Sequence, residues 1–341
     1  MEQVTIIGVD LAKRGFQLHG ARADGSVAFR VKLSREEVLG FLAEQPRCVV
    51  AMEACASAYH WGREIEALGH AVKLIPPICV KPYVKRQKND AADAEAIAEA
   101  ASSPTMRFVE VKTPEQQGLA MLFRTRDLLV RQRIQTVNAL RGHLAEFGIV
   151  APQGTVHVRK LSEAIEDPDA GLPQTARDLA RLLFDQFLEL QGRIKLLERE
   201  VRHRAPRDER VARLMTVPGV GPICAMAVQA FAPSMRCFEK GRDLAAWVGL
   251  TPRQRSTGGK ARLGRASKMG QRDLRRLFIV GASAVIGWAS RKPPREGSWL
   301  HRMMARKPRM LVAVALANKM AHTIWALLTK GGTCRDPALA A

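Results

Sequence analysis

The chain has 341 residues, of which 47% are hydrophobic, and its 54 lysines and arginines against 33 aspartates and glutamates give a formal net charge of +21. This composition excludes a largely disordered protein, and the length predicts two or three domains. The charge indicates a polyanionic partner. Nucleic acid is favoured over an anionic membrane, because no basic amphipathic helix with an aromatic face stands out.

The first part of the chain predicts a mixed α/β domain. Short apolar runs rich in β-branched residues indicate strands, and the turn ADGS separates two of them. Ser34 with Glu37 three residues later predicts the start of a helix by a capping box. We expect strands at residues 4–9, 16–19, 27–31, 48–52 and 71–75, and helices at 34–44 and from beyond 53 to about 68. Three antiparallel strands followed by strand, helix and strand give this fold class.

Four acidic residues stand out in this domain. Asp10 and Glu53 each come directly after a buried strand, where polar side chains of α/β sheets often form sites. Asp90 and Asp93 lie three apart at the mouth of the alanine-rich helix KNDAADAEAIAEA, so they share one helix face. The residues alone allow two interpretations: ordinary strand ends and helix caps, or ligands that hold a metal ion against a phosphate.

Long helices are predicted in the middle and at the end of the chain. Residues 114–147 form a basic helical pattern that includes Arg124 and Arg131. A heptad seam follows, and it predicts packing either against a helix of the same chain or in a dimer. The apolar stretch 310–328 is interrupted by polar residues, so we interpret it as a buried helix and not as a membrane span. The seam consists of Leu183, Phe187, Leu190, Ile194, Leu197 and Val201.

Two glycine-containing segments are candidate phosphate contacts. In TVPGVGP, residues 216–222, Gly219 and Gly221 precede a helix whose first N–H groups suit a phosphate oxygen, although any tight turn between helices uses such glycines. Residues 249–276 carry nine basic residues against one acid, and they lead into an apolar helix. Such a loop is a binding surface, and the hydroxyl groups within it at Ser256 and Thr257 suit phosphate binding or attack on a phosphate.

The cysteines and the N-terminus point to a reducing compartment. The six cysteines contain no CxxC pair and no zinc-finger spacing, so free thiols in a cytosol are expected. The N-terminal segment MEQVTIIGVDLAK lacks the features of a signal peptide. No Walker loop or GxGxxG motif supports nucleotide or nicotinamide chemistry.

These segments together resemble the DEDD transposases of bacterial insertion sequences, the group described as recombinases guided by a bridge RNA or seekRNA. The resemblance runs almost from end to end, and VDLAK, FQLHG and STGGK are most similar to the eleven-eleven branch of the family. The motifs that carry it are IGVDLAKRGFQLHG, AMEACASAYHW, KNDAADAEAI, VPGVGP and AAWVGLTPRQRSTGGKARLGRASKMG.

The resemblance implies a fold and a division into domains. Residues 1–155 would form an α/β RNase H-like (RuvC-like) catalytic domain and residues 156–205 a helical coiled-coil segment or linker. Residues 206–332 would form a mostly α-helical transposase domain with a helix-hairpin-helix-like turn. Asp10, Glu53, Asp90 and Asp93 would bind Mg²⁺, and Ser256 would be the nucleophile that joins covalently to DNA, with Thr257 as the alternative position.

The resemblance also implies partners. They are double-stranded donor and target DNA, a non-coding guide RNA, and further copies in a homodimer or homotetramer, in the bacterial cytoplasm at the nucleoid and away from membranes. Two other functions use the same residues: a metal-dependent junction resolvase or nuclease with water as nucleophile, and a non-catalytic basic nucleic-acid-binding protein. The candidate nucleic-acid contacts are Lys85, Arg86, Lys88, Arg124, Arg131, Gly219, Gly221, Arg253, Arg255, Thr257, Lys260, Arg262, Arg265 and Lys268.

Overall fold

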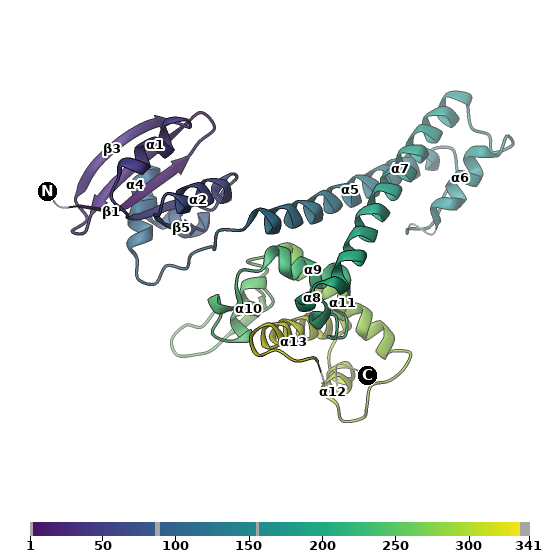
Figure 1. Cartoon of the computed structure of the whole chain (residues 1–341). Helices are drawn as coiled ribbons and strands as arrows, with labels where there is room; N and C mark the ends of the chain where they lie inside the picture. The colour runs from purple at the N-terminus through teal and green to yellow at the C-terminus, as the bar shows by residue number, and fades with distance from the viewer. Residues whose placement is uncertain (1–2, 86–88, 155–156, 335–341) are drawn as a thin grey trace. The chain divides into compact units, whose positions relative to one another are not determined.

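The structure is a computed structural model that describes residues 3–85, 89–154 and 157–334. Its internal contacts form two compact units, Met1–Glu115 and Gln116–Ala341, which are treated separately below (Figure 1). The predicted three segments with limits at 155 and 205 remain a prediction. Two predicted nucleic-acid contacts, Arg86 and Lys88, lie outside the described residues.

Unit 1 is built on a five-stranded mixed sheet with the order β3-β2-β1-β4-β5. The first three strands are antiparallel neighbours, and β4 and β5 run parallel to β1. This arrangement confirms the predicted mixed α/β unit. Its elements are β1 (Val4–Leu11), β2 (Gly15–Arg22), β3 (Val27–Ser34), α1 (Glu37–Glu44), β4 (Val49–Glu53), α2 (Ala58–Ala67), β5 (Ala71–Ile75), α3 (Pro77–Val80), the 3₁₀ turn η1 (Lys81–Tyr83) and α4 (Asp90–Ser102).

Several element boundaries differ from the sequence prediction, and those at Ser34, Asp10 and Glu53 bear on the predicted cap and site. Ser34 belongs to β3, and α1 begins only at Glu37. The expected contact still forms in part, because the backbone N–H of Ser34 donates to a Glu37 carboxylate oxygen at 2.8 Å. Asp10 and Glu53 are residues of β1 and β4 and do not follow them.

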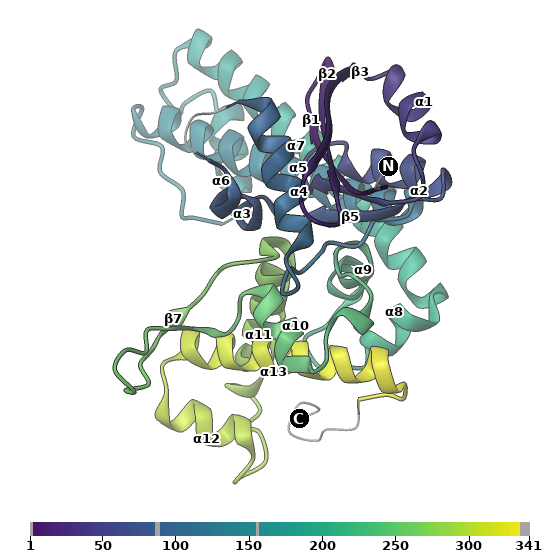
Figure 2. The ribbon, with the colours of Figure 1, turned by 90° about the vertical axis from the view of Figure 1, so that its left-hand side faces the viewer.

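The two faces of the sheet are covered by different helices (Figure 2). Successive side chains of a strand point to opposite faces. Ile7 and Val9 of β1 pack with residues of α1 and α2 in one apolar cluster, whereas Ala51 of β4 and Ile97 of α4 belong to another. The alternation therefore places every second residue of β1 and β4 on the side of α4.

Helix α4 packs unusually close to β1. A Cβ atom at Gly8 would lie 2.2 Å from the carbonyl oxygen of Ala94 and 2.7 Å from the amide nitrogen of Ala98. Only glycine in the strand, facing alanines on the helix, permits this approach. The close contact fixes the first turn of α4 beside the end of β1.

Unit 2 contains a pair of long antiparallel helices, α5 (Pro114–Ala145) and α7 (Gln174–Arg204), with α6 (Val158–Glu166) packed beside them (Figure 1). Phe123 near the start of α5 shares a cluster with Val201 near the end of α7, and Val137 shares one with Phe187. Arg126 Nε donates to Glu198 Oε1 at 3.1 Å between the same helices. The predicted heptad seam therefore packs within its own chain, while its identity as a coiled coil stays a prediction.

The remaining helices of unit 2 enclose one large apolar core. Gly219 and Gly281 let two backbone segments meet beside it, because a Cβ on Gly219 would lie 2.7 Å from the carbonyl oxygen of Gly281. These elements are η3 (Ala205–Arg207), α8 (Glu209–Leu214), α9 (Pro222–Phe231), η4 (Met235–Cys237), α10 (Gly241–Val248), β6 (Pro252–Gln254), β7 (Leu263–Ala266), α11 (Arg272–Ala289), α12 (Trp299–Arg306) and α13 (Arg309–Lys330).

Helix α13 is the central helix of this core. Of the described helices it is the one that is long and apolar enough to cross a membrane. Core helices of globular domains have the same length and composition, and one face of α13 is buried among α8, α10, α11 and α12. The predicted buried helix is confirmed. Its buried residues are Val312, Ala313, Leu316, Ala317, Met320, Ala321, Ile324 and Leu327.

The basic segment 249–276 is mounted on folded elements at both ends. Gly249 ends α10 with φ +81°, and a Cβ there would lie 2.0 Å from the carbonyl oxygen of Met269. The N–H of Gln271 donates to Trp247 O at 3.1 Å, which closes the base of the loop. Strands β6 and β7 form a two-stranded hairpin above this base, which the sequence reading did not predict.

Replacing Gly8 by alanine should disturb unit 1 through the close contact with α4. The added methyl group forces α4 away from β1, and such overpacking costs about 1–3 kcal/mol. Urea unfolding of Gly8→Ala, followed by circular dichroism, should show this loss in the transition of unit 1.

The matched control is Gly40→Ala in α1, where a Cβ would meet nothing within 4 Å. That change should stabilise the helix by ~0.5–1 kcal/mol. Equal stability of the two variants would contradict the close packing of α4 on β1.

Candidate metal centre

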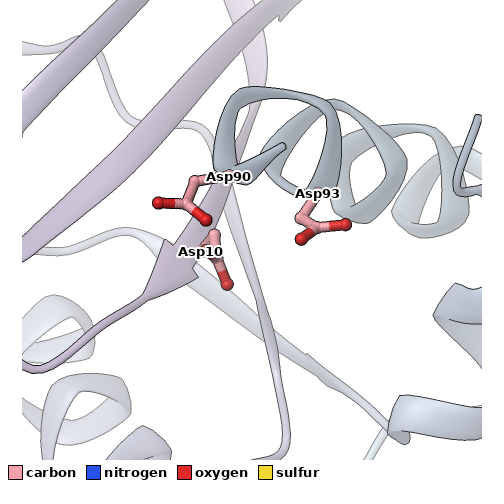
Figure 3. Close-up of side chains that lie close together, drawn as sticks. All are labelled: Asp10, Asp90 and Asp93. Atoms are coloured by element: carbon pink, nitrogen blue, oxygen red, sulfur yellow. The ribbon is translucent and has the colours of Figure 1, made fainter. Parts of the chain in front are cut away.

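Three aspartates converge at the end of β1. One carboxylate oxygen each from Asp10, Asp90 and Asp93 lies within 4.8 Å of those of the other two. Asp10 extends from the strand and the other two from the first turn of α4 (Figure 3). Asp10 and Asp93 are half-buried, and Asp90 is exposed. The cluster is therefore open to solvent on one side.

Strand alternation and helix geometry explain this convergence. Asp10 follows Gly8 by two residues, so both face α4. Asn89, and neither aspartate, caps α4, since its side chain accepts the N–H of Ala91 at 3.1 Å. With the cap supplied by Asn89, the carboxylates at positions 90 and 93 are left to face the strand.

Glu53 is the fourth predicted acid, and it lies on the neighbouring strand. The parallel register pairs Val9 with Met52, so the next residues, Asp10 and Glu53, lie at the same level of adjacent strands. Glu53 is not part of the group within 4.8 Å. Burial raises the pKa of its carboxyl, the negative charge of Asp93 raises it further, and Lys81 lowers it. Glu53 therefore lies within electrostatic reach of the cluster.

The donor set fits a hard divalent cation. All the clustered ligand atoms are carboxylate oxygens, which Mg²⁺ and similar ions prefer, and the open side leaves room for water or a phosphate oxygen. Without a cation, ionised carboxylates at this separation repel one another. A bound cation would remove this repulsion, and Asp10, Asp90 and Asp93 are the residues placed to hold it.

The predicted nucleic-acid contacts have varied surroundings. Lys85 Nζ pairs with Glu95 at 2.6 Å and Glu99 at 3.2 Å, so its charge is balanced within unit 1. Arg131 of α5 pairs with Asp127 at 3.4 Å, and Arg124 on the same helix is exposed. Lys85 is thus the least available of these cations for a phosphate.

The hairpin of β6 and β7 presents the predicted hydroxyl groups among exposed cations. Ser256 is exposed, and its Oγ accepts the N–H of Arg262 at 3.4 Å. Thr257 pairs with Lys260 across a tip formed by Gly258 and Gly259, whose φ values of +54° and +74° favour glycine. Among the residues that the structure describes, no carboxylate pairs with the predicted contacts Arg253, Arg255, Lys260, Arg262, Arg265 and Lys268.

The two glycines before α9 differ in their surroundings. Gly219, with φ +84°, is required by its packing against Gly281. Gly221 is the exposed N-cap residue of α9, and a Cβ there would meet nothing within 4 Å. Gly221 is therefore the more accessible of the two for a phosphate, and the use of either remains a prediction.

Two supporting residues were missed by the sequence interpretation. The asparagine immediately before a helical run is a recognised N-cap signal, and it could have identified Asn89. Gly8 had no such signal, because its role depends on how closely α4 approaches. Neither residue is a ligand, but both position the acids.

Comparison with known proteins assigns the family. The DEDD transposase family model of the IS110 type, described as "Transposase", matches residues 7–149. The model described as "Transposase IS116/IS110/IS902 family" matches residues 211–296. A DEDD transposase domain implies an RNase H-like fold, with which the mixed five-stranded sheet of unit 1 is compatible, and it typically uses a divalent metal.

Full-length relatives lead to the same assignment. A probable family 20 transposase of Pseudomonas aeruginosa is 47% identical over 97% of this chain and 98% of its own length. The transposase for insertion sequence element IS1328 of Yersinia enterocolitica is 40% identical over 97% of this chain and 98% of its own length. The transposase for IS1111A of Coxiella burnetii is 38% identical over 98% and 92%. The chain therefore belongs to the IS110/IS116/IS902 family of insertion-sequence transposases, enzymes that act on DNA.

Proposed function

We propose that this transposase cleaves and rejoins DNA with Mg²⁺ held by four acids and with a serine nucleophile, and that a non-coding RNA guides it. The observation that carries the proposal is the convergence of Asp10, Asp90 and Asp93, with Glu53 on the adjacent strand. It acts on donor and target DNA in the bacterial cytoplasm, at the nucleoid.

The acids bind the cation, and the fold keeps them in place. Asp10 is fixed by the β1 register, and Asp90 and Asp93 by the capped first turn of α4. Bound Mg²⁺ supplies stabilisation of the negative charge that builds up on phosphate oxygens during displacement. Glu53 completes the ligand set from β4. Burial and the charge of Asp93 raise the pKa of its carboxyl, and a cation beside it would oppose this rise and favour the ionised form that binds metal.

Ser256 is proposed as the nucleophile. Its Oγ forms a bond to a DNA phosphorus as its proton leaves, while the bond from that phosphorus to a deoxyribose oxygen breaks and this oxygen takes up a proton. The phosphodiester is kept as a phosphoserine ester, so the reverse step rejoins strands. Exposure of Ser256 on a hairpin rich in cations supports this role, because the cations bind the DNA backbone beside it.

Guide RNA and assembly complete the proposal. The hairpin cations, which have no acidic partner among the described residues, and the net charge of +21 support binding of a second polyanion beside DNA. On the outer surface of α7, Leu179, Leu182, Leu188 and Leu196 are 48–62% exposed. Exposed leucines on a helix support a subunit contact, which the proposal assigns to a homodimer that pairs into a tetramer.

Asp93→Asn should abolish transposition while leaving folding and DNA binding intact. Removing a residue that only hydrogen-bonds to a metal ligand typically lowers activity roughly 10–100-fold. Loss of a ligand itself should lower transposition by more than this. The frequency of excision from a plasmid that carries the gene with its flanking DNA measures this loss. The control is Glu99→Gln, which removes a carboxylate of the same helix outside the cluster. Normal excision by Asp93→Asn would refute the metal site.

Ser256→Ala should lose a covalent protein–DNA adduct that Thr257→Ala keeps. The adduct is detected as a DNA-linked band on a denaturing gel after incubation with Mg²⁺. Loss of the adduct in Thr257→Ala alone would move the nucleophile by one residue. Cleavage without any adduct in the wild type would favour water as the nucleophile, as in a junction resolvase.

RNA should co-purify with the protein, and sequencing should return one species encoded beside the gene. Binding should weaken steeply as salt rises, because each neutralised phosphate releases counterions. Recovery of only random cellular RNA would argue against guidance.

Glu53→Gln should stabilise the metal-free protein at neutral pH. The raised pKa of Glu53 means that its ionisation costs stability as pH rises through that value. The gain should therefore be present at pH 7 and vanish below about pH 4, where both states are protonated. Urea unfolding in EDTA measures the gain, with Glu36→Gln as an exposed control. A gain that persists at low pH would assign it to another cause.

A further inference from the structure

A pocket of about 300 Å³ lies on α5 of unit 2, among residues that the proposed function does not use. Its wall on α5 is a single helix face, since its members recur at helical spacing, and residues of the loop after α5 form the opposite wall. The lining residues are Arg133, Ile134, Val137, Asn138, Arg141, Gln153 and Gly154.

Arg141 holds this pocket open. Its Nη2 donates to the carbonyl oxygens of Pro152 at 2.9 Å and Gly154 at 2.8 Å. These two bonds keep the loop beside α5. The pocket is therefore formed by an arginine bridge and does not depend on apolar contact alone.

The two arginines of the pocket have unmet hydrogen-bonding capacity. The Nε atoms of Arg133 and Arg141 are both buried, and no described residue accepts a hydrogen bond from either. No carboxylate of the described residues pairs with them. A buried donor without a partner is unfavourable, more so in a charged group, and a ligand acceptor that a small turn of the guanidinium could reach would remove that cost.

The rest of the lining identifies the chemical class of ligand. Arginines bind phosphate through paired N–H donors, and amide groups such as those of Asn138 and Gln153 both donate and accept, as base edges require. Ile134, which is 50% exposed, and the buried Val137 both line the pocket and give it an apolar floor for a ring. Hydrogen-bond donors for a phosphate, amide groups for a base edge and an apolar floor for a ring together suit one nucleotide.

The size of the pocket limits the ligand further. Pockets for small ligands occupy roughly 300–1,000 Å³, so this one is at the lower limit. A base within a duplex is stacked on both sides and cannot enter such a pocket, whereas bases of single strands are free to do so.

We infer that this pocket binds one unstacked nucleotide of a single-stranded segment, with Arg133 at its phosphate, Asn138 and Gln153 at its base, and Arg141 holding the loop in place. The inference goes beyond the proposed function, because the pocket uses neither the acids nor the hairpin. DNA and RNA both supply such a nucleotide, and the experiment distinguishes them.

Photo-crosslinking of the full-length protein in EDTA tests this site without requiring catalysis. The probes are a single-stranded DNA 16-mer with one 4-thiothymidine, the corresponding RNA with 4-thiouridine, and the DNA probe annealed to its complement. Trypsin cleaves after Arg133 and Arg141, so a crosslink in the pocket appears on the peptide Ile134–Arg141 in mass spectrometry. We expect it with a single-stranded probe and not with the duplex. A crosslink with DNA, with RNA or with both supports the inference and shows which nucleic acid supplies the bound nucleotide.

Variants separate a fitted pocket from diffuse charge. Neither Arg133→Lys nor Asn138→Ala changes the net charge of the protein. Each should lower the crosslink yield about fivefold, the ratio that corresponds to ~1 kcal/mol for one hydrogen bond. Arg193→Ala in α7, where Arg193 pairs with Glu189 at 2.5 Å, removes a charge away from the pocket and should change little. Absence of the crosslink with both single strands, an equal yield with the duplex, or equal losses in Arg133→Lys and Arg193→Ala would overturn the inference.

Discussion

The close packing of α4 on β1 is the contact on which the acid cluster depends. Gly8 lets the backbone of the helix approach the strand, with Ala94 and Ala98 facing it. Since Asp10 follows Gly8 on the same face, the contact that seats the helix also brings its first turn to Asp10. The carboxylates oppose this arrangement by their mutual repulsion, so the apolar packing of unit 1 must hold them together until a cation binds.

Charge is distributed unevenly in a way that suits an enzyme acting on a polyanion. Unit 1 concentrates carboxylates at a strand end, and these by themselves repel a phosphate. The hairpin of unit 2 carries exposed cations that pair with no carboxylate in the described part of the chain. Under the proposed function, the cations attract the nucleic acid at long range, and only a cation-loaded acid cluster tolerates a phosphate beside it. Affinity and chemistry are therefore separable properties of the chain, and substitutions can test them independently.

Much of the fold was predictable because local patterns determine it. The strand 71–75 agrees with β5, and the helix from Pro114 agrees with α5 to within two residues at its end. Ser34 misled the prediction of α1, since pairing with Gly15 in the sheet kept it in β3 while Glu37 still reached its N–H. Of the site, the spacing of Asp90 and Asp93 predicted a shared face. The approach of α4 to β1 and the pocket on α5 depend on contacts between distant segments, which no local pattern encodes.

The glycines of unit 2 show why a motif can be recognised before its purpose is known. Gly219 was a candidate phosphate contact, yet its packing against Gly281 already requires glycine at this position. Gly249 and Gly270 similarly let two backbones meet at the base of the basic hairpin, where a Cβ on Gly270 would lie 1.9 Å from Trp247 O. Gly219 and Gly281 allow close packing between two backbone segments, whereas Gly249 and Gly270 anchor a charged loop whose tip stays exposed. An anchored base with an exposed tip limits the entropic cost of positioning Ser256 on binding, which suits the role of nucleophile that we propose for it.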